Sequence, residues 1–393
     1  MQRDIHFYGV YALARAVGID WDTSKTIAYA SQFVDDATDE GVVILPDLPP
    51  NQSENVLSFQ GRHEETGSTD RRGDNRQALW SGQKGIIPIM TSHRPLDYSN
   101  AIPGDQWRVW IPFHFLPGNE PVSGSFLERM ICRKDSQPVR RMLSHALHWG
   151  CQAGNDPAST RDCWPHLIGI TAHVYADTFS HHGFIGMAHP WNKVKGRSLE
   201  TADDRSTSFI DCLMKKVETC MAWIAGDLAE MVPVGHGAVA DYPDLPYLRW
   251  RFEYEEREST PEEIQRDNRA DFLGGCEGLF RFFHSFAEGN SHIQDMRGPR
   301  DWHAISGHVE RLLRIEASTE DRCQAWKEAI VSNRFCRCTE MDQEIRYDPD
   351  AWTLRKTRAV FTTTGDAYRF LMAAWRHQTY VLRELLPEIG LLA

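Results

Sequence analysis

Apolar residues recur at intervals of three and four along most of the chain, which is the spacing of one face of an α-helix. Within the first 40 residues, two such stripes are formed by Ala12, Leu13, Ala16 and Val17, and by Ile27, Ala30, Ser31 and Val34. We therefore predict two helices in this region, with Asp22 or Thr23 as the N-terminal cap of the second.

The helical spacing is interrupted after residue 45 and returns after Ser125. The tract 46–82 is polar and rich in turn-forming residues, so we expect an irregular insertion there. Pro and Gly break the short apolar runs in 84–98 and 107–118, which favours ordered loops or short strands over long helices. Further helices are predicted over 139–151, 165–182 and 208–231, with four or five more after Thr260. The pattern as a whole predicts an all-α fold with long ordered loops.

Composition excludes several classes of protein. The chain has 393 residues, of which 41% are hydrophobic and 25% charged, as expected for a soluble globular protein. A net charge of −12 disfavours a general polyanion-binding surface. No stretch approaches the roughly 20 apolar residues of a membrane span. Because Asp4, His6 and Arg15 interrupt the N-terminal apolar stretch, no secretory signal is recognised. We expect a cytoplasmic protein, with export by a non-classical route left open, and reduced thiols for its nine Cys.

The segment Thr171–Phe184, TAHVYADTFSHHGF, carries the strongest chemical pattern. His173, Asp177 and His181 follow one another at steps of four, so a helix places them on nearly the same face. Two imidazoles and a carboxylate in this arrangement suit Zn²⁺, and a carboxylate is costly to bury unless a cation neutralises it. Pro165 suits the first turn of this helix and Gly183 suits its end.

Other candidate ligands are spread over the first 250 residues. They are Asp4 and His6 near the start, Asp35 and Asp36 at the end of the second predicted helix, the loop residues His93 and His114, and His236 with Asp241 or Asp244. The order of these residues resembles that of the zinc-dependent phospholipase C and P1-nuclease superfamily, which is all-helical and binds up to three zinc ions. The chain also resembles a group of bacterial proteins that share DIHFYG, QFVDD, PFHFLPG and HVYADTFSHHGF, a resemblance that implies no activity.

The superfamily resemblance implies a ligand set. Its members are His6, Asp35 or Asp36, His93, His173, Asp177, His181 or His182, and His236 with Asp241 or Asp244. His114 is expected to serve only as a loop hydrogen-bonding residue. In secreted members of the superfamily the amino group of a processed N-terminal Trp binds metal, and we expect Asp4 to take that role here. The spacing after Asp177 is shorter than in the superfamily, and Ala240 interrupts the last motif, so one or two ions are better supported than three.

The expected activity is hydrolysis of a phosphoester, with a phospholipid and a nucleic acid as competing substrate classes. The expected catalytic residues are Asp35, Asp36 and Asp177, and the expected cofactor is Zn²⁺. The alternative is a metal-stabilised helical protein without catalysis, acting as an interaction or toxin component. A phosphohydrolase of the HD type is disfavoured because no His in the chain is followed directly by Asp. We assign residues 1–255 to a metal-binding core and residues 256–393 to a helical extension packed on it.

Overall fold

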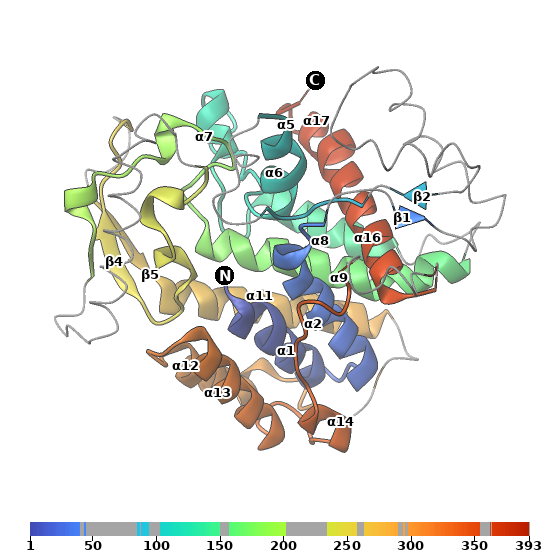
Figure 1. Ribbon diagram of the computed structural model, residues 1–393. Helices are drawn as coiled ribbons and strands as arrows, with labels where there is room; N and C mark the ends of the chain where they lie inside the picture. The colour runs from blue at the N-terminus through green and yellow to red at the C-terminus, as the bar shows by residue number, and fades with distance from the viewer. Residues whose placement is uncertain are drawn as a thin grey trace.

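The computed structural model describes residues 1–39, 43–44, 85–86, 88–93, 103–149, 157–201, 234–257, 263–289, 294, 298–353, 362 and 364–392. Helices make up most of this part of the chain, and a small sheet lies to one side of them (Figure 1). The predicted insertion 46–82 and the predicted helix 208–231 lie outside the described residues. The prediction of a mostly helical protein is confirmed, with the sheet as an addition.

Among the described residues up to Trp149, the structure has short and medium helices and one strand pair. The elements are the π-helical turn η1 (Asp4–Gly9), α1 (Val10–Ala16), α2 (Trp21–Asp36), β1 (Val43–Ile44), β2 (Gly85–Ile86), α5 (Pro103–Asp105), the π-helical turn η4 (Gln106–Trp110), α6 (Ile111–Phe113), α7 (Phe126–Met130) and α8 (Gln137–Trp149). Strands β1 and β2 pair antiparallel, with Val43 opposite Ile86.

The remainder contains the longest helices and the small sheet. The elements are α9 (Pro157–Ser180), η6 (Pro190–Asn192), η7 (Gly196–Ser198), β3 (Glu200–Thr201), η8 (Gly237–Val239), η9 (Tyr242–Asp244), β4 (Arg249–Phe252), β5 (Ile264–Asp267), α11 (Asn268–Glu288), α12 (Trp302–Leu313), α13 (Thr319–Val331), α14 (Glu340–Gln343), α16 (Asp366–Tyr380), η11 (Val381–Leu385) and α17 (Leu386–Glu388). The sheet is antiparallel in the order β3-β4-β5, with Trp250 opposite Arg266 and Thr201.

Helix α9 is the centre of the helical part and packs against α2, α8, α11 and α16. Its apolar residues are buried on all sides rather than along one stripe, which is the pattern of a core helix. Gly169 allows α2 to approach closely, because a Cβ atom there would lie 2.3 Å from the carbonyl oxygen of Ile27. The helix begins eight residues before Pro165, so the prediction that Pro165 occupies the first turn is wrong. Gly183 follows the helix end and adopts a φ of 93°, a conformation that glycine tolerates.

Residues 103–113 correct a second expectation, since they form helical turns and not loops or strands. Elements α5, η4 and α6 follow one another directly, and His114 caps the last of them. Pro103 begins the run, where its missing N–H is not needed, whereas Pro112 lies inside it, directly after the π-helical turn η4. The π-helical turn η4 lies between the two prolines and brings His114 to the end of the run.

The N-terminal cap of α2 is Asp20, one residue before the helix, and neither Asp22 nor Thr23. Its side chain accepts hydrogen bonds from the backbone N–H groups of Asp22 and Thr23, each at 3.0 Å. Asp20→Ala is expected to lower the free energy of unfolding by about 1 kcal/mol, because two first-turn N–H groups lose their partner. Urea unfolding measures this change. Asp22→Ala is the matched control, and an equal loss in both variants would contradict the assignment.

The buried apolar residues of the described part of the chain form two groups. The larger group is helical and takes residues from both predicted domain ranges, including Phe7, Phe272 and Trp326. The smaller group surrounds the sheet and includes Phe115 and Trp250. Residues after 255 therefore share one core with the N-terminal helices. None of the described helices is both long and apolar enough to cross a membrane.

Candidate metal centre

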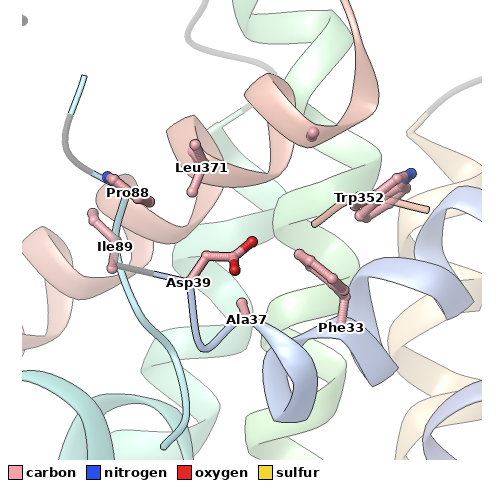
Figure 2. Close-up of a pocket in the computed structure, with 8 residues that line it drawn as sticks. Phe33, Ala37, Asp39, Pro88, Ile89, Trp352 and Leu371 are labelled. Carbon is pink, nitrogen blue, oxygen red and sulfur yellow. The ribbon is translucent and has the colours of Figure 1, made fainter. Parts of the chain in front are cut away.

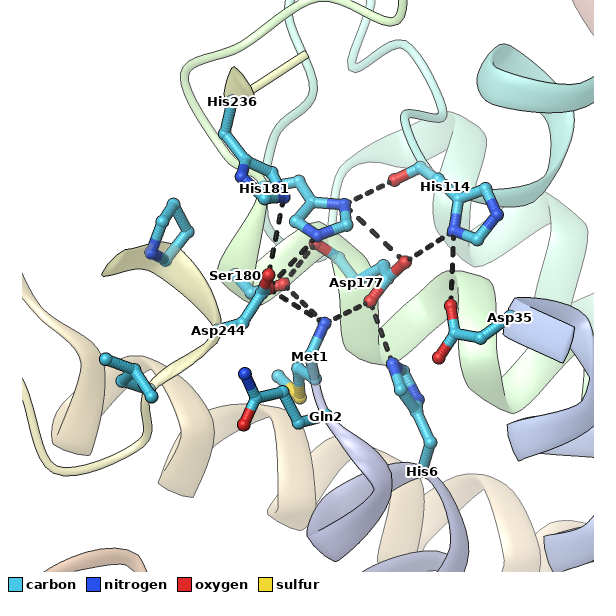
Figure 3. Close-up of polar contacts among 12 residues, drawn as sticks. Met1, Gln2, His6, Asp35, His114, Asp177, Ser180, His181, His236 and Asp244 are labelled. Atoms are coloured by element: carbon cyan, nitrogen blue, oxygen red, sulfur yellow. Dashed lines mark hydrogen bonds and ion pairs between the residues drawn. The ribbon is translucent and has the colours of Figure 1, made fainter. Parts of the chain in front are cut away.

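Histidine and carboxylate side chains from distant parts of the chain converge near the end of α9 (Figure 3). Among the described residues, three groups have potential ligand atoms within 4.8 Å of one another. The first group is His6, Asp35 and His173, the second is His114, His173 and Asp177, and the third is His181, His236 and Asp244. The N-terminal turn, the end of α2, the end of α6, the end of α9 and the segment before β4 each contribute. We call these eight residues the His/Asp cluster.

Asp177 lies at the centre of the cluster and is 1% exposed. Its Oδ1 atom is 2.7 Å from the α-amino nitrogen of Met1 and 3.1 Å from Nε2 of His6. Its Oδ2 atom is 3.1 Å from Nδ1 of His114 and 3.2 Å from Nε2 of His173. Both carboxylate oxygens are thus surrounded by nitrogen atoms, and the residue can bridge two cations.

Backbone carbonyls orient three of the imidazoles. Nε2 of His114 lies 2.8 Å from the carbonyl of Thr91. A carbonyl only accepts, so this ring nitrogen carries the proton and Nδ1 is left facing Asp177. In the same way Nδ1 of His181 donates to the carbonyl of His114 at 2.9 Å, and Nδ1 of His236 donates to that of Ala240 at 2.8 Å.

The opposite nitrogens of these rings face carboxylates. Nε2 of His181 is 3.3 Å from Oδ1 of Asp244, and Nε2 of His236 is 3.5 Å from its Oδ2. A neutral ring nitrogen and a carboxylate oxygen are both acceptors, so a proton or a metal cation has to lie between them. Metal-binding histidines are held in this manner, with the second ring nitrogen hydrogen-bonded elsewhere.

Burial differs from one side of the cluster to the other. His6 and His173 are fully buried and stack on each other with ring centroids 3.9 Å apart. In contrast, the side chain of Asp35 is 32% exposed and that of His236 18% exposed. Solvent or a substrate would therefore approach the cluster past Asp35 and His236.

The charges of the cluster depend strongly on one another. Burial and the neighbouring Met1 amine lower the pKa of His6 to about 4. Burial alone would lower the pKa of the Met1 amine, but Asp177 and Asp244 outweigh it and raise that pKa to about 11. Burial alone would likewise raise the pKa of Asp177, and the neighbouring His181 and Met1 amine instead hold that pKa well below its usual range. The carboxylate of Asp177 is thus stabilised as an anion that faces the Met1 ammonium group.

His114 and Asp35 have their pKa values raised. For His114, the hydrogen bond to Asp177 and its charge outweigh burial. For Asp35, desolvation by the surrounding protein outweighs the charge of His114 and raises the pKa to about 8.

Cationic side chains fix the end of α9. The guanidinium of Arg266 donates to the carbonyls of Ser180 and His182, at 2.7 and 2.9 Å. The carbonyl of Gly183 accepts from Tyr254 and Arg257. These bonds satisfy carbonyls at the C-terminal end of the helix, where positive charge is favourable. They hold the backbone on both sides of His181 in place.

Five candidates from the sequence belong to none of the three groups: Asp4, Asp36, His93, His182 and Asp241. Asp4 forms a buried ion pair with Arg322 at 2.7 Å, so the structure does not bring it to the cluster. Asp36 accepts hydrogen bonds from Tyr347 and Gln32, whereas Asp35 faces the cluster. Nε2 of His93 lies 3.7 Å from Asp105. His182 is paired with Asp271 at 2.8 Å, so His181 is the member of the doubled pair that faces Asp244.

Two groups that contact Asp177 were not predicted from the sequence: the imidazole of His114 and the Met1 amine. His114 was expected to be only a loop hydrogen-bonding residue, yet it contacts Asp177 and His173. The Met1 amine was expected to be replaced by Asp4, yet the amine itself lies between Asp177 and Asp244. The feature of the sequence that could have indicated His114 is its position directly after Pro112 and Phe113, at the end of a helical run.

A small pocket lies beyond the end of α2 (Figure 2). Its lining residues are Phe33, Ala37, Asp39, Pro88, Ile89, Trp352, Ala367 and Leu371, and none of them belongs to the His/Asp cluster. With one carboxylate and no imidazole, this lining lacks the donors of a metal site. The convergent polar chemistry is therefore in the cluster and not in the pocket.

The fold and the cluster define a mostly helical protein with a candidate metal centre of histidine and carboxylate side chains. The chain belongs to the family of unknown function DUF6765, whose family model matches residues 1–385. No curated protein and no solved structure gives a significant match to the chain.

Proposed function

We propose that this protein is a metal-dependent hydrolase that acts on a phosphoester, with Zn²⁺ as its cation. The observation that carries the proposal is the orientation of His114, His181 and His236. Each ring donates one N–H to a backbone carbonyl and turns its other nitrogen towards Asp177 or Asp244. Such rings are ready to bind a cation without rearrangement.

The donor set fits Zn²⁺, which binds imidazole nitrogen and carboxylate oxygen. Asp177 would lie between two positions. One position is surrounded by His6, Asp35, His114 and His173, and the other by His181, His236, Asp244 and the Met1 amine. The group of His6, Asp35 and His173 shares His173 with the group of His114, His173 and Asp177. Because one ring nitrogen binds one ion, these two groups would hold a single ion between them. With the third group, the cluster therefore supports two ions best. Binding to the Met1 amine would require loss of its proton.

A bound metal pair would lower the pKa of a water molecule and stabilise negative charge on phosphoryl oxygens. The chain's own residues would position the reactants. The carboxylate of Asp35 lies at the exposed edge, 3.7 Å from Nε2 of His173, where it can accept a proton from the attacking water. Asp177 is too deeply buried to contact a substrate, so its part would be to bind the cation and hold the histidine ligands around it. Asp36, bound by Tyr347, takes no part in this arrangement.

The substrate classes to be compared are phospholipids and nucleic acids. One partly buried aromatic ring lies beside the cluster: Trp110, 5.2 Å from the ring of His114. Either a base or an apolar chain could pack on such a ring. The net charge of −12 disfavours long nucleic acid, because its phosphates bind best to positive surfaces.

The test begins with metal analysis of the purified chain, carrying its tag at the carboxyl end so that the Met1 amine is unchanged. We expect bound Zn²⁺ that a chelator removes and added Zn²⁺ restores. The metal-loaded protein is then assayed against a generic phosphodiester, phosphatidylcholine vesicles and single-stranded DNA. Hydrolysis of at least one, lost on chelation and regained with Zn²⁺, is the expected result.

Two outcomes would contradict the proposal. A chain that holds only trace metal and gains none on addition of Zn²⁺ has no metal centre of this kind. A chain that holds metal, unfolds at lower temperature on chelation and hydrolyses none of the three substrates supports the non-catalytic alternative.

The composition of the cluster favours catalysis over that alternative. Structural zinc sites are closed and usually rich in Cys, whereas this cluster has an exposed edge and no thiol among its members.

A further inference from the structure

Arg322 holds the N-terminal segment from the opposite side of the His/Asp cluster. It belongs to α13, far from the cluster in sequence, and is 1% exposed. Its Nε atom donates to Oδ2 of Asp4 at 2.7 Å, and its Nη2 atom donates to the side-chain carbonyl of Gln2. Thr319, on the same helix, also donates to Gln2, at 2.7 Å. One helix therefore fixes two side chains among the first four residues.

The two anchored residues, Gln2 and Asp4, lie between the two groups of this segment that reach Asp177. Met1 precedes Gln2, and His6 follows Asp4 by two positions. The backbone carbonyl of Gln2 accepts from the N–H groups of Ile5 and His6, at 2.9 and 3.0 Å, so the anchored residue is tied directly to the turn that carries His6. Any displacement of Gln2 and Asp4 would move both the Met1 amine and the imidazole of His6 from Asp177.

Remaining bonds of Arg322 make its position rigid. Its Nη1 atom donates to the carbonyl of Ala317 at 2.6 Å, and its guanidinium lies 5.7 Å from the ring centroid of Tyr247. A planar guanidinium presents its donors in a rigid fork that suits two partners at fixed directions, whereas the three donors of an ammonium group rotate on a flexible stem. The arginine is thus matched to the simultaneous binding of Asp4 and Gln2.

We propose that Arg322 is a positioning residue of the metal centre, which holds the first residues of the chain so that the Met1 amine and His6 face Asp177. This inference rests on the proposed metal-dependent function. It gives the region after residue 255 a part in the centre, although none of the cluster residues comes from that region. It also assigns Asp4 to the anchoring of the N-terminus.

The chain contains a matched control for this proposal. Arg15 and Asp342 form a second fully buried ion pair, at 2.8 Å, which also joins an N-terminal helix to the region after residue 255. It lies at the far end of α1 from the turn that carries His6. Replacement of either arginine by lysine keeps the positive charge and removes the planar fork.

The experiment compares Arg322→Lys with Arg15→Lys. Zn²⁺ affinity is measured by chelator competition, at a temperature where circular dichroism shows both variants folded. We expect Arg322→Lys to weaken Zn²⁺ binding by roughly 10- to 100-fold, the range typical of residues that orient metal ligands. Arg15→Lys is expected to retain the affinity of the unaltered chain, even where its melting temperature falls. The Co²⁺ absorption spectrum, which reports the ligand set, should change only in Arg322→Lys.

A milder variant covers the case in which Arg322→Lys does not fold. Gln2→Ala leaves the ion pair of Asp4 intact and removes one anchor, and it should weaken Zn²⁺ binding towards the lower end of that roughly 10- to 100-fold range. Unchanged affinity and Co²⁺ spectra in the folded variants, with metal bound by the unaltered chain, would refute the positioning role alone. Failure of the unaltered chain to bind Zn²⁺ would refute the proposed function, and this inference with it.

Discussion

Asp177→Asn is expected to remove most of the bound metal. The asparagine has the size of the aspartate but carries no negative charge, and its amide NH₂ would face ring nitrogens instead of accepting from them. Because Asp177 lies within 3.2 Å of nitrogens from Met1, His6, His114 and His173, its loss affects both proposed metal positions. We expect Zn²⁺ affinity to fall by more than the roughly 100-fold seen for residues that only orient ligands. Metal analysis and chelator competition measure the effect.

Asp36→Asn is the matched control for Asp177→Asn. Asp36 belongs to the same region of the fold, but its carboxylate bonds Tyr347 at 2.6 Å and Gln32 at 3.2 Å. The variant should keep the metal content of the unaltered chain. Equal metal loss from both variants would contradict this prediction: either Asp36 would be a metal ligand, or Asp177 would have only a structural role.

His114→Ala is expected to empty the position between Asp35 and Asp177. The backbone carbonyl of Thr91 holds the ring of His114. The Nδ1 atom of this ring lies 3.1 Å from Oδ2 of Asp177 and 3.3 Å from Nε2 of His173. Its removal takes away a donor and leaves the neighbouring buried groups less satisfied. We expect Zn²⁺ content to fall by at least one ion for each chain, measured by metal analysis, and phosphodiester hydrolysis to fall with it.

His93→Ala distinguishes the geometry from the expectation based on sequence. The resemblance to the phospholipase C and P1-nuclease superfamily favoured His93 as the ligand of this region. In the structure its Nε2 atom is 3.7 Å from Asp105, and the residue belongs to none of the three groups. The variant should therefore retain its metal. Metal lost from His93→Ala and retained in His114→Ala would reverse the assignment of the two histidines.

The parts of the site that follow helical periodicity could be predicted from the sequence. His173, Asp177 and His181 lie at steps of four, and the regular geometry of a helix brings them together without further information. Asp35 and Asp36 could be placed at the end of a helix, but adjacent residues point in different directions. The choice between them depends on how α2 packs on α9, which in turn depends on the close approach at Gly169.

The parts that depend on long-range packing could not be predicted. His114 follows a helical run that begins at Pro103 and contains Pro112, and in a sequence prolines at such positions are typical of loops. Asp4 was expected to bind metal, because its actual partner, Arg322, lies more than 300 positions away and leaves no local pattern. The cap of α2 is a different case: the choice is local, but Asp20, Asp22 and Thr23 are all suitable residue types.

The wide spread of the cluster along the chain has a consequence for the order of assembly. Its members begin at the N-terminal turn and end at Asp244, and the segment that anchors the N-terminus is made later still. During synthesis, the first histidine, His6, must wait for 171 further residues before its partner Asp177 exists. A cation bound there would act as a cross-link that closes several long loops, and long loops are costly in entropy to close. Capture of the metal would therefore be among the final steps in the maturation of the chain.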